Sequence, residues 1–346
     1  MLRFVLRRLL LLVPVLVGLS VLLLLWVHAL PGEPARALLG ERATDQSIAT
    51  VNRLYGFDRP LHEQYVTYVS ALLQGDFGSS SRTGQPVLAT FLERFPATIE
   101  LSVAALTFAV LLGVPLGYAA AKRHGSVVDS LVVSGSLLGV VVPVFFLAYL
   151  LKLVFAVGLD VQLGPLNLAD LAVLPTAGRQ DARIDATHIT NFYVLDGLLT
   201  REWDAAWDAL VHLVLPALAL GTIPLAIIVR ITRASVLEVL GEDYVRTARA
   251  KGLARGLISR RHVLRNALLP VATTIGLQTG LLLAGAVLTE TVFAFNGIGE
   301  YLFQAISSLD FAVLQGFILF IALVYALVNL VVDVSYGIID PRVRVS

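Results

Sequence analysis

The chain has 346 residues, of which 57% are apolar and only 15% are charged, with a formal net charge of +1. A soluble domain has about a quarter of its residues charged, so this composition argues against a soluble globular protein, and the small net charge argues against a nucleic-acid-binding protein. Cysteine is absent, which excludes disulfides, thiolate metal sites and cysteine nucleophiles.

Six apolar blocks predict six transmembrane helices, at about residues 9–30, 97–121, 127–158, 210–229, 269–295 and 312–334. Each block is near the roughly 20 residues that cross a hydrocarbon core of about 30 Å. Backbone amides inside lipid must be paired within the segment, and no alternating barrel pattern is present, so helices are expected. The first block is too long for the apolar part of a secretory signal and precedes further spans, so we interpret it as an uncleaved helix.

These blocks predict an all-α polytopic membrane protein in three parts. Residues 1–30 form the N-terminal tail and the first helix, and residues 31–96 form a sizeable extracytoplasmic segment. Residues 97–346 form a core domain that holds five helices, an extracytoplasmic loop at 159–209 and a cytoplasmic loop at 230–268.

Charge asymmetry predicts the orientation of the helices. If the N-terminus is cytoplasmic, the segments on its side hold 16 of the 26 basic residues. The two long segments on the other side hold nine arginines against fifteen acidic residues. Because positive residues concentrate in cytoplasmic loops, we expect a multi-pass protein with both termini in the cytoplasm.

The long loops and one glycine pair carry further structural signals. Residues 47–73 contain several aromatic and apolar residues, so we expect a small cap with short helices there rather than a disordered linker. A short helix at 196–209 would place Trp203 and Trp207 on one face, as membrane anchors or, alternatively, as a platform for a ligand. Gly113 and Gly117, four residues apart, predict close approach of a neighbouring helix.

No motif for catalysis is present in the sequence: we find no phosphate-binding glycine loop, no metal-ligand cluster and no nucleophile elbow. Three ionisable residues come near the spans. Lys152 could extend towards the outer interface, Glu290 lies near the outer end of the fifth span, and Asp333 lies near the cytoplasmic end of the sixth. They form no chain across the bilayer, so a proton relay is disfavoured, and we expect either a passive pore or a machine driven from outside.

The most informative segment is the basic loop at 241–269. Acidic residues at 242–243 favour the start of a helix, and Gly252 can end that helix in the left-handed conformation. A second short helix is expected after Gly256, with an apolar side formed by Leu257, Ile258, Val263 and Leu264. Such a helix–glycine–helix could rest on lipid headgroups or insert into a groove on a cytoplasmic partner, and its chemistry leaves both alternatives open.

The residues of this loop carry a family resemblance. The segment 244–253, Tyr-Val-Arg-Thr-Ala-Arg-Ala-Lys-Gly-Leu, followed by His262 and by Arg-Asn-Ala-Leu-Leu-Pro at 265–270, resembles the cytoplasmic EAA-type loop of ABC importer permeases. It is most similar to the dipeptide/oligopeptide/nickel branch, and within it to the first of the two permease subunits. The resemblance extends to Gly-Asp-Phe-Gly-Ser-Ser at 75–80, Asn-Gly-Ile-Gly at 296–299 and Asp-Pro-Arg at 340–342.

The resemblance implies a type I importer-like fold in which the loop fits a cleft in an ATP-binding subunit. The residues implied in this coupling are Asp243, Tyr244, Arg246, Thr247, Ala248, Lys251, Gly252, Leu253, Arg265 and Asn266. Arg246 replaces the glutamate that names the motif, so no role of that glutamate is transferred.

The implied function is that of a permease subunit of an ATP-driven importer for di- or oligopeptides in the bacterial inner membrane. The implied partners are a homologous second permease, two ATP-binding subunits that bind ATP and Mg²⁺, and an extracytoplasmic substrate-binding protein. The chain itself would have no catalytic residue, metal or cofactor, and its substrate path is not assigned to residues.

Three alternatives stay open at this point. Importers of the same family carry nickel chelates or haem. An ion-coupled transporter would require intramembrane carboxylates or helices broken at mid-depth, which the sequence does not show. A structural scaffold would not require the helix–glycine–helix loop.

Overall fold

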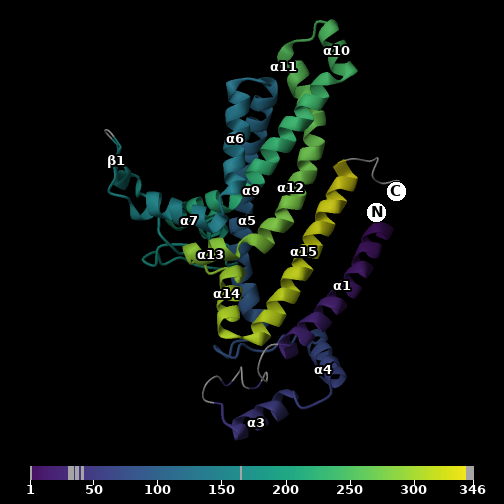
Figure 1. The fold of residues 1–346 in the computed structure, drawn as a ribbon, viewed down its shortest axis with the longest axis vertical. Helices are drawn as coiled ribbons and strands as arrows, with labels where there is room; N and C mark the ends of the chain where they lie inside the picture. The colour runs from purple at the N-terminus through teal and green to yellow at the C-terminus, as the bar shows by residue number, and fades with distance from the viewer. Residues whose placement is uncertain (1, 30–34, 36–38, 40–42, 164–165, 340–346) are drawn as a thin grey trace. The chain divides into compact units, whose positions relative to one another are not determined.

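The computed structural model describes residues 2–29, 35, 39, 43–163 and 166–339 (Figure 1). Two compact units divide the chain: Met1–Phe95 with Gly297–Ser346, and Pro96–Asn296. Residues 297–346 thus group with the N-terminal part of the chain. The reason is long-range packing, since the last helix lies against the first.

The first unit contains two long helices side by side, α1 (Leu2–Ala29) and α15 (Phe311–Ile339). The start of α5 (Val87–Lys122) and α14 (Ile298–Ser308) complete its core. In that core the ring of Phe91 meets the ring of Phe317 edge to face, with centroids 5.3 Å apart.

The expected cap is confirmed as two short helices, α3 (Asp45–Tyr55) and α4 (Leu61–Leu73). Thr44 starts α3, because its hydroxyl accepts a hydrogen bond from the backbone amide of Ser47 at 3.2 Å. Gly56 ends it with a φ of +70°. After α4, the Ser80 hydroxyl donates to the buried carboxylate of Asp310 at 2.6 Å, which fixes this turn to the start of α15.

The second unit is built around α9 (Trp203–Gly241), which packs against α12 (Arg265–Gly285), α6 (Val127–Val141), α7 (Val144–Lys152) and α8 (Tyr193–Leu199). Shorter elements connect these helices. They are the π-helices η2 (Leu153–Val157) and η4 (Ile258–Leu264), the 3₁₀ turn η3 (Leu168–Leu171), and the helices α10 (Asp243–Ala250), α11 (Arg255–Leu257) and α13 (Val287–Phe293). Two two-residue strands, β1 (Gln162–Leu163) and β2 (Leu166–Asn167), pair antiparallel, with Gln162 opposite Asn167.

The close helix approach expected at the glycine pair of α5 is confirmed. A Cβ on Gly117 would lie 2.6 Å from the carbonyl oxygen of Val229, and one on Gly113 would lie 2.8 Å from the side chain of Ile228. Both neighbours belong to α9, so only glycine permits this contact between α5 and α9.

The third span differs from our prediction of one continuous helix at 127–158. The chain bends by 100° between α6 and the segment Val144–Val157. Pro143 lacks an amide hydrogen, and Val142 before it adopts an extended conformation with ψ of 124°, so the helix stops there. The sequence did not show this bend.

Within the described residues, five helices are long and apolar enough to cross a membrane, or six if the bent pair is one span. Several helices are longer than the predicted spans, because hydropathy marks the lipid-crossing part of a helix and not its ends. The helix expected at 196–209 is in fact divided, since α8 ends at Leu199 and α9 begins at Trp203. Trp203 and Trp207 both lie exposed near the start of α9.

Candidate coupling segment

The segment 241–269 lies at one end of the second unit, beyond the ends of α9 and α12 (Figure 1). At Glu242 the backbone turns extended, with φ of −68° and ψ of 145°, so α9 ends and α10 begins one residue later. Gly252 follows α10 with a φ of +73°, as predicted, and its amide donates to the Arg249 carbonyl at 3.0 Å. The left-handed conformation at Gly252 therefore ends α10 and directs the chain back towards α12.

The inner side of α10 is apolar and buried. Val245 is fully buried and Ala248 nearly so, and both belong to one cluster with Ala121, Val236, Ile258, Val263 and Ala267. This cluster joins α10 to α5, α9, η4 and α12. Burial of such a cluster is the main force that holds a helix of only eight residues, because an isolated helix of this length is not stable in water.

The outer side of α10 is polar and exposed. Asp243 and Arg246 form an ion pair at 3.3 Å, but their side chains are 91% and 71% exposed, so the pair contributes little stability. The Arg246 guanidinium also donates to the Gly241 carbonyl at 3.0 Å, and the Thr247 hydroxyl donates to the Asp243 carbonyl at 2.9 Å. These contacts are local, so the outer side keeps its charges available to a partner.

The return segment is held to α10 and α5 by side-chain hydrogen bonds. The Asn266 amide donates to the Tyr244 hydroxyl at 3.0 Å and to the His262 carbonyl at 2.9 Å. The hydroxyls of Tyr118 and Ser259 are also hydrogen-bonded. Two predicted coupling residues, Tyr244 and Asn266, are thus in direct contact although they are 22 positions apart.

The predicted coupling residues divide into two groups in the structure. Nine are exposed on or near α10: Asp243, Tyr244, Arg246, Thr247, Lys251, Gly252, Leu253, Arg265 and Asn266. Ala248 instead points into the buried cluster, where it can only support the segment. The anchoring residues Val245 and Ala267 were not singled out from the sequence, although the three-residue spacing of Val245 and Ala248 is a helical signal for one buried face.

An ion pair joins α6 to the last part of α9, which leads into the segment 241–269. The Arg233 guanidinium donates to both carboxylate oxygens of Asp129, at 2.6 and 2.8 Å, and the Gly125 amide donates to the same carboxylate at 3.0 Å. A bidentate pair of this kind fixes geometry better than a single contact. It ties the turn after α5 to the part of α9 that leads into α10.

Other buried polar contacts lie away from this segment. The Thr98 hydroxyl donates to the fully buried carboxylate of Glu290 at 2.6 Å. The Lys152 ammonium donates to the Val292 carbonyl at 2.9 Å. The side chain of Asp333 lies outside the described residues.

Among the described residues, no group of three or more histidine or acidic side chains could hold a metal ion. The inner side of α10 shares one apolar cluster with α5, α9 and α12, whereas its outer side is charged and exposed.

Comparison with known proteins gives matches along almost the whole chain. The family model of the binding-protein-dependent transport system inner membrane component matches residues 113–345, and the model of the N-terminal part of such membrane components matches residues 1–104. The chain is 46% identical to the di/tripeptide transport system permease protein DppB of Pseudomonas aeruginosa, over 99% of each chain. It is 43% identical to the dipeptide transport system permease protein DppB of Alkalihalophilus pseudofirmus, over 99% of this chain and all of that one. It is also 38% identical to the glutathione transport system permease protein GsiC of Salmonella paratyphi A, over 99% of each chain.

Proposed function

The chain belongs to the family of inner-membrane permeases of binding-protein-dependent ABC importers, and from this premise we propose that it carries di- or tripeptides across the inner membrane. Relatives of full length at 42–46% identity are named as dipeptide or di/tripeptide permeases, which supports this substrate class. The chain would form half of the pathway. A homologous permease would form the other half, and a binding protein would deliver the peptide from outside.

The proposed energy input is the segment 241–269. ATP and Mg²⁺ would bind to two separate ATPase subunits, and α10 would dock on them through its outer side. The observation that carries this proposal is the two-sided structure of α10, with a buried apolar anchor and an exposed charged surface. Because the anchor includes residues of α5, α9 and α12, closure of the ATPases would move these helices as one body. This arrangement favours docking of α10 on a protein partner over binding of α10 to lipid headgroups, because its exposed side bears charges of both signs.

Docking in the cytoplasm requires α10 to lie on the same face of the membrane as the ATPases. The charge asymmetry of the loops supports this orientation, with both termini cytoplasmic. A cysteine-accessibility experiment tests it directly, because the chain has no native cysteine. Labelling of Arg246→Cys from outside intact cells would contradict the orientation.

The docking proposal is tested by reversing one charge on the outer side of α10. Arg246→Glu leaves the apolar anchor intact, and like charges across a docked surface weaken binding. We expect at least about tenfold less ATPase subunit to co-purify with the variant. Arg183→Glu, at another exposed arginine, in the 159–209 loop, is the matched control and should leave co-purification of the ATPase subunit unchanged. Equal co-purification by both variants would sink the docking proposal.

The substrate proposal is tested with the complex reconstituted in vesicles together with its binding protein. ATP-driven uptake of a radiolabelled dipeptide should exceed that of a nickel chelate or haem. Uptake of only a chelate or haem would replace the peptide assignment within the same family. Uptake that continues without ATP and stops when the proton gradient is removed would instead indicate an ion-coupled transporter.

A further inference from the structure

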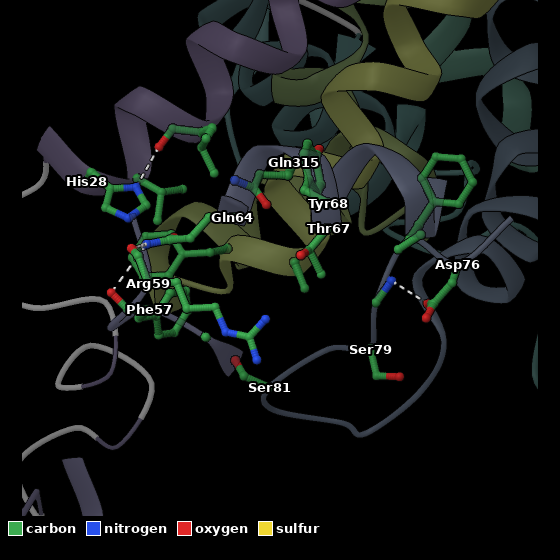
Figure 2. A pocket seen from close by; sticks show the side chains of 18 of the residues that line it. His28, Phe57, Arg59, Gln64, Thr67, Tyr68, Asp76, Ser79, Ser81 and Gln315 are labelled. Atoms are coloured by element: carbon green, nitrogen blue, oxygen red, sulfur yellow. Dashed lines mark hydrogen bonds between the residues drawn. The ribbon is translucent and has the colours of Figure 1, made fainter. Parts of the chain in front are cut away.

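A cavity of about 480 Å³ lies in the first unit (Figure 2). It is lined by the end of α1, the helices α3 and α4, the turn at 76–81 and the start of α15. Its volume is in the usual range of small-molecule sites. The role proposed for the coupling segment makes no use of this cavity.

Two buried polar atoms in its lining have no hydrogen-bond partner within the described part of the chain. They are His28 Nε2 and the Tyr68 hydroxyl. Buried polar atoms are nearly always paired, so each unpaired atom requires a reason. A ligand that is absent from the structure would supply both partners.

The tautomer of His28 defines which partner it needs. Its Nδ1 lies 2.9 Å from the Leu24 carbonyl oxygen, which can only accept a hydrogen bond, so Nδ1 carries the proton. In the neutral ring Nε2 is then an acceptor and requires an N–H or O–H from a ligand. Tyr68 can donate its O–H, because burial raises the pKa of this phenol and keeps it protonated.

The lining also carries charges of both signs. Among the described residues neither Arg53 nor Arg59 has a carboxylate partner, and both are exposed at the rim. Asp76 supplies the opposite charge, and one of its oxygens accepts from the Gly78 amide at 2.9 Å. Figure 2 shows His28 and Arg59 on one side of the cavity and Asp76 on the other. A ligand with an anionic and a cationic end would match this arrangement.

The remaining lining has a polar and an apolar part. Apolar surface comes from Leu24, Val27, Phe57, Phe77 and Phe311. Polar side chains are Gln64, Thr67, Ser79, Ser81 and Gln315, of which the two glutamine amide nitrogens already donate to backbone carbonyls and leave their amide oxygens for a ligand. Apolar walls with a few placed polar groups are typical of a site for a small organic molecule. The polar side chains on α4 and on the turn at 76–81 can form hydrogen bonds with amide groups, and they would pack poorly against a lipid acyl chain.

We propose that this cavity is a second binding site for a short peptide in its zwitterionic form, on the extracytoplasmic cap. The peptide carboxylate would bind Arg53 and Arg59, and the ammonium would bind Asp76. A peptide N–H would donate to His28 Nε2, and the Tyr68 hydroxyl would donate to a peptide carbonyl. The choice of a peptide rests on the proposed function, because the same charges would also suit a zwitterionic phospholipid headgroup.

The test measures equilibrium binding of radiolabelled Ala-Phe to the whole importer complex in nanodiscs, without the binding protein. We expect saturable binding, with the N-acetyl and C-terminal amide forms at least about tenfold weaker, because each loses one charged contact. Tyr68→Phe should weaken binding about three- to tenfold, and Arg59→Gln about tenfold. Arg82→Gln, at an exposed arginine outside the lining, should bind like the unmodified complex.

Two results would overturn the proposal. Equal binding of the free and blocked dipeptides to the unmodified complex would show that the site does not recognise the charged ends of the peptide. This comparison uses no variant, so it does not depend on whether a variant folds. A phospholipid seen by native mass spectrometry on the unmodified complex, and lost in Tyr68→Phe and Arg59→Gln, would make the cavity a lipid site. If the complex with its binding protein imports Ala-Phe in the same preparations, either result removes the cavity proposal alone. If no peptide is imported, the proposed function fails.

Discussion

The contact between α5 and α9 at Gly117 allows a quantitative prediction. A Cβ at this position would lie 2.6 Å from the Val229 carbonyl oxygen, 2.7 Å from Thr232 Cβ and 3.2 Å from the Arg233 amide nitrogen. Two of these three atoms are backbone, so no side-chain rotation relieves the clash. In Gly117→Ala the two helices must therefore separate, and such overpacking costs about 1–3 kcal/mol.

A matched control removes the effect of helix propensity, which favours alanine over glycine by about 1 kcal/mol. Gly135 lies within α6, and a Cβ there would meet nothing within 4 Å. The unfolding free energy of Gly117→Ala, measured by SDS titration in mixed micelles, should be lower than that of Gly135→Ala by about 1–3 kcal/mol. Gly113→Ala should fall between them, because its nearest neighbour is the side chain of Ile228, which can adjust.

The same variant should also affect energy coupling. Ala121, one turn after Gly117, belongs to the cluster that holds α10, so displacement of α5 would loosen that anchor. We expect Gly117→Ala to lower peptide-stimulated ATP hydrolysis more than Gly135→Ala does. A Gly117→Ala protein as stable as Gly135→Ala would refute the reasoning, because it would show that α5 and α9 separate without cost.

Three further outcomes are expected. Arg233→Ala should lower the unfolding midpoint, because it leaves the carboxylate of Asp129 without its bidentate partner. The charge-swapped double variant, Asp129→Arg with Arg233→Asp, should recover part of this loss. No recovery would argue against a direct interaction. Val245→Ala should cost about 2 kcal/mol and reduce co-purification of the ATPase although the outer side of α10 is unchanged; unaltered stability would contradict the anchor. Hydrogen bonds from the backbone amide of Thr187 and, second, from its hydroxyl lower the pKa of the Glu202 carboxyl. The stabilisation of the folded state by this carboxylate is therefore complete above the unfolded pKa of about 4.3 and is lost as pH falls through the folded pKa. Limited proteolysis of the 159–209 loop should therefore accelerate at low pH, and Glu202→Gln should remove this dependence.

Features that depend on local composition could be predicted from the sequence. The six apolar blocks follow from hydropathy, and the left-handed Gly252 follows from its place after a run of helix-forming residues. The close approach at Gly113 and Gly117 was also predictable, because two glycines four positions apart clear one face of a helix.

Features that depend on distant residues could not be predicted. The pair of Asp129 and Arg233 joins positions 104 apart, and no pattern near either residue indicates the other. The spacing of Val245 and Ala248 indicates one buried face, but the residues of α5, α9, η4 and α12 that cover this face follow only from the tertiary packing. At Pro143 the difficulty was different, because proline inside a membrane helix can be accommodated by a kink, and the residues on both sides are equally apolar.

The bend after α6 has a consequence for the surrounding lipid. With 15 residues at about 1.5 Å each, α6 is about 22 Å long, whereas the hydrocarbon core is about 30 Å thick. A helix shorter than the hydrocarbon core is accommodated by thinning of the bilayer, by extension of flanking side chains to the interface or by association with other helices. The acyl-chain length of the host membrane therefore sets how large a mismatch this short helix presents.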